Sequence, residues 1–480
     1  MAGIGFELKK LFSRKGIVLA VRANLYASLV VAGPMILGAL LLLGAKFISD
    51  WGGASNHEQD LIIVIITYSL LFSLLLSSIF LFVLARYVAD KLYVNEYDRI
   101  LPSMYGAISV LLVIGSIAWI IFLYFSTLPF RYSVYSFILF CEGVVVWNQI
   151  NYITAVKEYR KILLGFLAGM SVGLLFSLWF IYLQYDVVAS LLAGSCIAYG
   201  ILVLTFTIVL HRFFPMGFGS SLKFLEWIDE YPPLLFVGFF TMLGLFAHIM
   251  IMWKSPWGVQ VHGLFYHAPA HDIPALLAFM TSLITAVNFV TSVEVNFYEK
   301  YRVYFNLLNG DGSLGNVEKA YDEMMTTLKR ELLYLALQQI FVTIIAIVVI
   351  GEILVYLNLG FTSVMIGLFR VLCVGYGMFA IGNCFMLFLL YFSSNKDALL
   401  AVTVFVVLNI VGTLYVITLP EVYYGFGLVL AGFGFYMVGW SRLLAYTNRL
   451  DYHTFTKQPV FFVERRGLFR GLVQKLESSD

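Results

Sequence analysis

The segment Leu61–Ala85 reads LIIVIITYSLLFSLLLSSIFLFVLA and contains no charged residue. As an α-helix rising 1.5 Å per residue, it would extend ~37 Å, more than the ~30 Å hydrocarbon core of a bilayer. Backbone N–H and C=O groups in hydrocarbon find no water, and a helix satisfies them internally. The segment therefore predicts a transmembrane helix.

Eleven other segments share this length and apolar character, so the sequence predicts an all-α integral membrane protein with about twelve transmembrane helices. Their ends are placed to within ~4 residues. In chain order the predicted spans are Tyr26–Gly44, Leu61–Ala85, Ser103–Phe125, Tyr132–Tyr152, Ile162–Leu183, Val187–Leu210, Leu234–Trp253, Ile273–Val295, Leu332–Val355, Phe361–Tyr391, Ala398–Leu419 and Tyr424–Tyr446. Only the short turn Gln184–Asp186 separates the fifth span from the sixth.

The composition agrees with a membrane protein. Hydrophobic residues make up 61% of the chain and charged residues 12%, whereas a soluble domain carries roughly a quarter charged residues. The chain therefore lacks the polar side chains needed to cover a water-facing globule. Its net charge of +2 gives no indication of nucleic-acid binding.

The positions of Lys and Arg predict the orientation, because cytoplasmic connections carry an excess of both. If both termini are cytoplasmic, the cytoplasmic segments hold 26 of the 30 basic residues. The external segments hold three, Lys46, Arg131 and Lys254, and Arg370 lies within a span. This alternation predicts cytoplasmic termini and an even number of spans.

The segment Ser221–Pro232 separates two blocks of six predicted spans. We therefore predict an N-terminal six-helix bundle with an interfacial amphipathic start over 1–220, a cytoplasmic linker over 221–232, a C-terminal six-helix bundle over 233–447 and a basic amphipathic tail over 448–480. Two facing bundles would enclose a cavity near the membrane midplane, a common arrangement in transporters.

Both ends of the chain contain an amphipathic pattern. The N-terminal stripe is Ile4, Leu8, Leu11 and Phe12, and the C-terminal stripe is Leu468, Phe469, Leu472, Val473 and Leu476 beside Arg465, Arg466, Arg470 and Lys475. Either helix is suited to anionic lipid headgroups. Either is also suited to docking on a cytoplasmic partner.

Two ionisable residues lie deep inside predicted spans, where a charge is costly and indicates function. Glu142 lies ~15 Å and Arg370 ~13 Å from the outer end of its span at 1.5 Å per residue. A pair between them would fasten the two halves. Alternatively, they belong to a substrate pathway, or Glu142 is a protonatable group.

Uncharged polar residues extend the candidate pathway. Gln149 lies seven residues after Glu142, and Thr281, Thr285, Asn288 and Ser292 form a stripe on the eighth predicted span. Hydroxyl and amide groups are suited to sugars, so the stripe predicts a water-filled cavity; the alternative is hydrogen bonding between packed helices. Pro34 would bend the first span, either as a gate or as a tolerated kink.

The external loop 254–272 contains His262, His267 and His271. A metal site there is the less favoured interpretation, because Pro269 opposes a regular helix between the last two. Trp253, Trp257, Phe265 and Tyr266 suggest an interfacial aromatic belt, or else a stack on sugar rings at the exit. The sequence has no nucleotide-binding loop and no hydrolase motif, which predicts no enzyme activity, no cofactor and no metal.

The N-terminal residues Met1-Ala-Gly-Ile-Gly-Phe-Glu-Leu-Lys-Lys-Leu-Phe, with Ala32-Gly-Pro in the first span, resemble the start of the Pel exopolysaccharide transporter family, PelG. The twelve-span layout agrees over essentially the whole chain. The resemblance implies the multidrug/oligosaccharidyl-lipid/polysaccharide flippase superfamily, whose fold is two six-helix bundles. It also implies location in the bacterial cytoplasmic membrane and a role in biofilm polysaccharide export.

The same resemblance implies a substrate and partners. The polymer would be a partially deacetylated, galactosamine-containing and hence cationic polysaccharide, which Glu142 would attract. The partners would be the cytoplasmic glycosyltransferase PelF and the membrane proteins PelD and PelE, with cyclic-di-GMP sensed by PelD. The alternatives are an ion-coupled exporter of drugs or lipid-linked oligosaccharides, and a membrane scaffold of a synthase complex.

Overall fold

The computed structural model of the 480-residue chain describes residues 38, 40–156, 159–217, 220–310, 312–356, 360–456 and 467–477. Three predictions fall wholly or mainly outside them: the N-terminal amphipathic helix, the gating role of Pro34 and most of the first span. The described part of that span, residue 38 and residues 40–44, is helical.

Eleven helices in the described residues are long and apolar enough to cross a membrane. They coincide one for one with the second to twelfth predicted spans, including the pair divided at Gln184–Asp186. The prediction of a multi-pass α-helical membrane protein is therefore confirmed.

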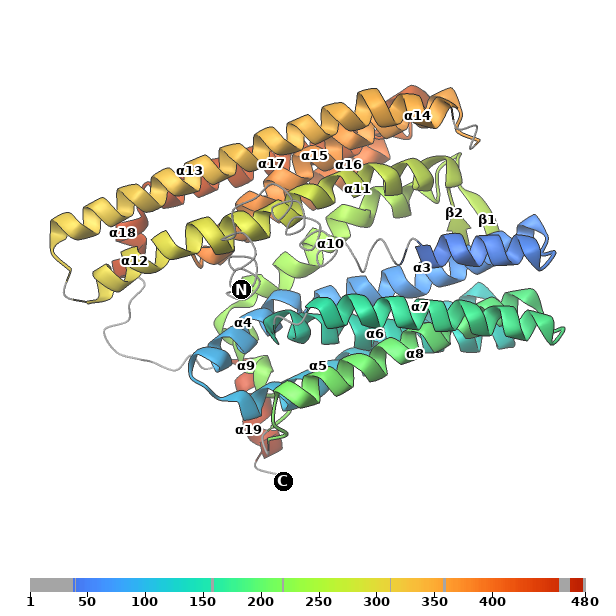
Figure 1. Cartoon of the computed structure of the whole chain (residues 1–480), viewed down its shortest axis with the longest axis horizontal. Helices are drawn as coiled ribbons and strands as arrows, with labels where there is room; N and C mark the ends of the chain where they lie inside the picture. Colours follow the sequence, from blue (N-terminus) through green and yellow to red (C-terminus); the bar gives the residue numbers. More distant parts are fainter. Residues whose placement is uncertain are drawn as a thin grey trace, which may run out of the picture. The chain divides into compact units, whose positions relative to one another are not determined.

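The described helices group into two compact units. The unit containing Gly33–Ala268 and Arg449–Asp480 is called here the N-unit. Its elements are α3 (Asn56–Ser78), α4 (Leu81–Tyr93), η1 (Tyr97–Arg99), α5 (Ile100–Ser126), α6 (Phe130–Val156), α7 (Tyr159–Tyr182), α8 (Val187–Phe213), η2 (Lys223–Leu225), α9 (Glu226–Glu230), α10 (Pro232–Met252), β1 (Val259–His262), β2 (Phe265–His267), α18 (Leu450–Thr456) and α19 (Leu468–Glu477). Figure 1 shows α7 and α8 side by side along their length, the most extensive helix pair in this unit.

The second unit, called here the C-unit, contains Pro269–Asn448. Its elements are α11 (Pro269–Thr291), a π-helix (Ser292–Phe297), α12 (Tyr298–Asn309), α13 (Leu314–Ile345), a second π-helix (Ala346–Ile350), α14 (Gly351–Tyr356), α15 (Ser363–Tyr391), α16 (Asn395–Val416), η5 (Glu421–Tyr423) and α17 (Phe426–Thr447). Helix α15 packs on α11, α13, α16 and α17 and is the centre of the unit.

Contacts place the first transmembrane helix after the linker, α10, with the N-unit, where it packs on α3 and α4. The contact boundary thus follows Ala268, whereas the sequence predicts the functional boundary at 221–232. The predicted division into two functional bundles stays a prediction.

Local sequence explains where α3 begins. Ser55 and Glu58 form a capping box, in which the Ser55 side chain accepts from the Glu58 N–H and the Glu58 carboxylate accepts from the Ser55 N–H. Such reciprocal bonds satisfy two of the free donors at a helix start. The helix ends at Ser78 and α4 begins at Leu81, so the prediction of one continuous helix over Leu61–Ala85 is wrong in its bounds.

The loop after α10 folds into an antiparallel hairpin, which pairs Val259 with His267 and His262 with Phe265 around a bulge. The Tyr266 N–H donates to the Tyr68 hydroxyl of α3 at 3.1 Å. Phe265 and Trp253 are buried against the Tyr68 ring, with centroids 5.0 and 4.5 Å away. The prediction that these two aromatic residues form an interfacial belt, or stack on sugar, is therefore wrong: they are core residues.

A single helical run of 41 residues, Leu314–Leu354, continues from α13 through the second π-helix into α14. Its first part is charged up to Arg330 and Glu331, and apolar residues follow from Leu332. Figure 1 shows α12 lying beside this first part. The α12–α13 hairpin therefore extends beyond the apolar part of the C-unit.

Candidate functional site

Glu142 lies in the middle of α6, on the side that faces α8. Its Oε2 atom is buried and has no hydrogen-bond partner among the described residues. A Cβ at Gly200 of α8 would come 3.1 Å from Glu142 Oε1, so the glycine leaves room for the carboxylate. A buried oxygen without a partner is costly and calls for a functional explanation.

Two amides follow Glu142 on α6. Gln149 Nε2 donates to Thr207 Oγ1 of α8 at 2.8 Å, and Asn148 Nδ2 donates to the Val144 carbonyl at 2.8 Å. The oxygens Gln149 Oε1 and Asn148 Oδ1 are buried without a partner in the described part of the chain. With Glu142, three acceptors on α6 thus have unused hydrogen-bonding capacity within the membrane span.

A serine ladder on α3, which the sequence analysis missed, faces α6 in the N-unit. Ser69, Ser73 and Ser77 are spaced four residues apart and share one face of the helix. Ser69 Oγ lies 3.0 Å from Ser136 Oγ, and Trp147 Nε1 donates to Ser73 Oγ at 3.0 Å. The four-residue spacing within an apolar run is the signal that could have revealed it.

In the C-unit, the predicted stripe, which follows α11 and ends at the first residue of the π-helix, is only partly open. Thr281, Thr285 and Ser292 are buried, and Asn288 is half-buried. The Thr285 hydroxyl donates to Gln339 Oε1 of α13, and Gln339 Nε2 donates to Thr343 Oγ1 at 3.1 Å. The sequence analysis did not single out Gln339 as a site residue. It lies in α13 beside Gln338, near the start of a long apolar stretch. The role of the four stripe residues in substrate passage stays a prediction.

These different exposures predict different reactivities for two cysteine variants. The sequence analysis favours a water-filled cavity along the whole stripe, in which both positions would react with a small water-soluble thiol reagent. In the structure, Thr285 is 1% exposed and contacts Gln339, whereas Asn288 is half-buried. We expect Asn288→Cys to be labelled and Thr285→Cys to be protected, as measured by mass shift after labelling in membranes. Equal labelling of both would contradict the packed position of residue 285 and favour the water-filled cavity.

Arg370 forms its ion pair within the C-unit. Its Nη2 atom lies 2.8 Å from Glu352 Oε1 of α14, with side chains 39% and 59% exposed. Gly351 lies beside the guanidinium, and Arg370 Nε is buried without a partner in the described residues. The pair with Glu352 supplies a counter-charge for Arg370 that does not depend on Glu142. Its place in a substrate pathway stays a prediction.

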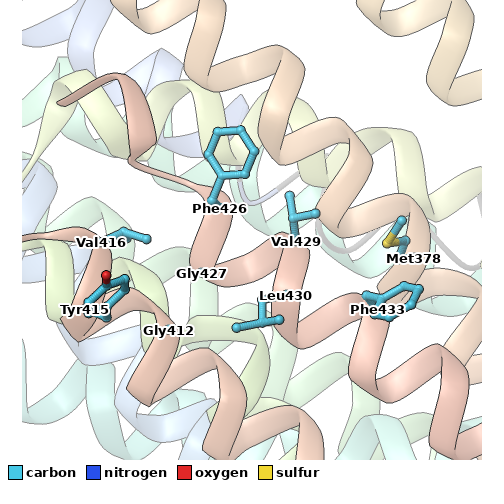
Figure 2. A pocket seen from close by; sticks show the side chains of 9 residues that line it. All are labelled: Met378, Gly412, Tyr415, Val416, Phe426, Gly427, Val429, Leu430 and Phe433. Atoms are coloured by element: carbon cyan, nitrogen blue, oxygen red, sulfur yellow. The ribbon is translucent and has the colours of Figure 1, made fainter. Parts of the chain in front are cut away.

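One pocket in the described residues is apolar. It has a volume of about 410 Å³ and lies in the C-unit. Figure 2 shows Tyr415 and Val416 of α16 and Phe426, Leu430 and Phe433 of α17 around it. Such a lining is suited to hydrocarbon and not to a hydrated sugar chain, so this pocket is not the candidate pathway.

The α12–α13 hairpin contains a polar groove of about 720 Å³. Its lining includes basic and acidic side chains. The basic ones are Lys300, Lys319 and Arg330, and the acidic ones are Glu318, Asp322 and Glu323. Lys300 Nζ bonds Glu323 Oε2 at 2.7 Å across the hairpin. With both signs of charge in its lining, the groove is a surface suited to polar contacts.

The described residues contain no group of three or more His, Cys, Asp or Glu side chains arranged to hold a metal ion. Of the three loop histidines, His262 contacts the Thr127 carbonyl at 3.1 Å and His267 lies 3.8 Å from Asp60. These contacts give both histidines a structural role in fixing the hairpin to the N-unit.

Solved structures with the same fold are transporters. A structure described as MATE in the straight conformation has 11% sequence identity and a TM-score of 0.59, covering 89% of this chain and 96% of that one. An outward-facing multidrug resistance MATE family transporter of the MOP superfamily has 12% identity, the same TM-score and the same coverages. A MOP superfamily transporter from Pyrococcus furiosus Vc1 (DSM3638) has 11% identity and a TM-score of 0.54, with coverages of 88% and 96%.

No curated protein matches the chain. The family model described as "PelG: Putative exopolysaccharide Exporter (EPS-E)" matches residues 1–455.

Proposed function

Because the chain belongs to this PelG family of exopolysaccharide exporters, we propose that it moves a Pel-like, amino-sugar-containing polysaccharide across the bacterial cytoplasmic membrane. Its family and its fold are those of membrane exporters. We further propose that it has no catalytic activity of its own and that the polymer is made by a partner.

The observation that carries the proposal is a set of buried acceptors on α6, of which Glu142 and Gln149 face α8 and Asn148 faces Ser77 of α3. Glu142, Asn148 and Gln149 each have an oxygen with no hydrogen-bond partner among the described residues, within an apolar span. Sugar hydroxyls are donors for such oxygens, and the ammonium group of an amino sugar is a donor with a charge opposite to that of Glu142. The stripe on α11 would add hydroxyl and amide groups from the C-unit.

Two other functions remain alternatives. The buried Glu142 and the MATE-like fold also favour an ion-coupled exporter of drugs or lipid-linked oligosaccharides, in which protonation of Glu142 changes the stability of one state. A membrane scaffold would have no use for unbonded oxygens inside a span, so we place it last.

The proposed partners are a cytoplasmic glycosyltransferase of the PelF type and membrane proteins of the PelD and PelE types. The charged α12–α13 hairpin supports a cytoplasmic contact, because it extends beyond the apolar part of α13 on the side that the Lys and Arg distribution predicts to be cytoplasmic. A polymerase held there would deliver its product directly to the transporter.

The test is deletion of the gene followed by an assay of secreted polymer. We expect secretion to be lost, with intact glycosyltransferase still present in the cells, and to be restored by the wild-type gene. A tagged copy should retain the glycosyltransferase on purification, and charge reversal at Lys319 and Arg330 should weaken that retention. Normal secretion in the deletion strain would exclude the proposed function.

A further inference from the structure

A line of polar groups follows the contact between α6 and α8 in the N-unit. On α6, Gln149 lies seven residues after Glu142 and therefore shares its face of the helix. On α8, Thr207 lies seven residues after Gly200, and His211 follows four residues later on the same face. The two faces meet, because Gly200 lies beside the Glu142 carboxylate and Gln149 Nε2 donates to Thr207 Oγ1 at 2.8 Å.

The line ends at an exposed histidine in the last turn of α8. His211 Nδ1 lies 2.9 Å from the Thr207 carbonyl oxygen, and Nε2 lies 3.2 Å from the Tyr105 hydroxyl of α5. A carbonyl only accepts, so Nδ1 carries a hydrogen and Nε2 is the atom that takes or releases a proton. From Gly200 to His211 the helix rises ~16 Å, about half of the hydrocarbon core. The line thus joins the middle of the span to the end of α8 that the Lys and Arg distribution predicts to be cytoplasmic.

Two acceptors on this line have unused hydrogen-bonding capacity. Glu142 Oε2 and Gln149 Oε1 are buried and have no partner among the described residues. Buried polar atoms are costly without a partner, and bridging water molecules commonly supply one. The two residues are ~10 Å apart along α6, a length that a short chain of hydrogen-bonded water molecules covers. The Thr207 hydroxyl, which accepts from Gln149, lies between this stretch and His211.

The charge of Glu142 does not depend on a neighbouring ion. Helix α6 packs on α3, α4, α5, α7 and α8, and no charged side chain in the described residues of these helices acts on Glu142. The titratable groups that interact with it electrostatically are Cys141 on its own helix and Cys196 and Tyr199 on α8. Thiols and phenols are neutral at ordinary pH. The charge is therefore set by the protons that reach the carboxylate.

We propose that this line, called here the access route and defined by Glu142, Gln149, Thr207 and His211, carries protons between the His211 side and the Glu142 carboxylate. A water molecule bonded to Oε2 gives one proton to the carboxylate and takes another from the next water molecule, so that the carboxylate becomes a neutral acid. The inference rests on the proposed function and deepens it, because a charged Glu142 attracts a cationic sugar and a neutral one does not. A higher proton concentration on the His211 side would thus release the polymer from Glu142.

The first measurement follows proton uptake by Glu142 in the full-length chain, purified in detergent. A light flash releases protons from a caged acid, and time-resolved infrared spectroscopy records the carbonyl band of the neutral carboxylic acid. The band that Glu142→Gln lacks reports on Glu142. We expect Gln149→Leu and Thr207→Val, which remove polar groups at similar side-chain size, to slow the rise of this band roughly tenfold or more.

The matched control is Thr205→Val, the same substitution in α8 on the side that faces α7, where a Cβ at Gly165 would lie 3.5 Å from Thr205 Cγ2. It should leave the rate unchanged. Thr207→Ser, which keeps the hydroxyl, should retain the wild-type rate and so separates lost hydrogen bonding from a packing defect. Equal rates in the wild type, Gln149→Leu and Thr207→Val overturn the access route.

The second measurement identifies the side from which protons arrive. Proteoliposomes with His211 outward are captured through a biotinylated Arg212→Cys, at the exposed position next to His211. A lipid-soluble carbodiimide modifies Glu142 only in its protonated form, and mass spectrometry measures the modified fraction. We expect this fraction to rise when the outside pH falls and to be insensitive to the inside pH.

Dependence on the inside pH, or no modification of Glu142 at any pH, overturns the access route. Either result leaves the proposed function standing, because loss of secretion in the deletion strain tests that function independently of proton access. Normal secretion in the deletion strain together with one-sided modification of Glu142 would instead exclude the proposed function and retain the route.

Discussion

Replacing Glu142 by Gln is expected to lower polymer secretion by about tenfold or more, the equivalent of ~1.4 kcal/mol in the limiting barrier. The amide has nearly the size of the carboxylate and fits beside Gly200, so packing is preserved. What is lost is the charge, together with an acceptor oxygen that no described residue satisfies. The measurement is secreted polymer per amount of transporter in the membrane, in the complemented deletion strain.

The matched control for this prediction is Glu421→Gln, the same substitution at an exposed position. It should leave secretion unchanged. Glu142→Asp, which keeps the charge on a shorter side chain, should restore part of the activity if attraction of a cationic sugar is the role. Normal secretion by the Gln variant, at normal protein abundance, would remove Glu142 from the transport mechanism.

Replacing Gly194 by Val is expected to destabilise the N-unit by about 3 kcal/mol, the upper part of the range for overpacking. A Cβ at Gly194 of α8 would lie 1.9 Å from Ser177 Oγ and 2.5 Å from the Gly173 carbonyl of α7. The serine side chain can turn away, but the backbone carbonyl cannot. The two helices would therefore have to separate along a contact where small residues allow near approach.

The measurement for Gly194→Val is the melting temperature of the purified protein, followed by tryptophan fluorescence. The control is Gly367→Val, also in a transmembrane helix, where an added Cβ meets nothing within 4 Å. Because valine is a better helix former than glycine, the control should be neutral or slightly stabilising. Equal melting temperatures for both variants would show that α7 and α8 are not held by this close packing.

Most of the fold was predictable from the sequence, because a membrane span is fixed by length and hydropathy alone. Eleven described helices follow the predicted spans. The prediction failed where individual side-chain contacts determine a helix boundary or the conformation of a loop. The break after Ser78 has no proline or glycine to mark it, although Ser55 and Glu58 did carry a readable capping box. The hairpin at 259–267 depends on a hydrogen bond and ring contacts with α3, nearly 200 residues away in the chain.

The candidate site was less predictable, because its partners lie on other helices. Glu142 can be found from the sequence because it is an ionisable residue within an apolar span. The glycine that makes room for it, however, lies on another helix, α8. Thr285 and Arg370 could be singled out from the sequence as polar groups in apolar helices, but their bonds to Gln339 and Glu352 depend on how α13 and α14 pack. Likewise, the stripe on α19 revealed an amphipathic helix and not the residue that caps it, Asp229 of α9, whose Oδ2 accepts from the Arg470 N–H at 2.9 Å.

The continuous helix Leu314–Leu354 has a mechanical consequence. Its 41 residues make a rod of ~60 Å, twice the thickness of the hydrocarbon core. A tilt of about 10° at the membrane boundary would swing its free end, ~27 Å away, through ~5 Å. A rod of this length would act as a lever: a small change of angle among the packed helices would become a displacement of several ångströms at its free end.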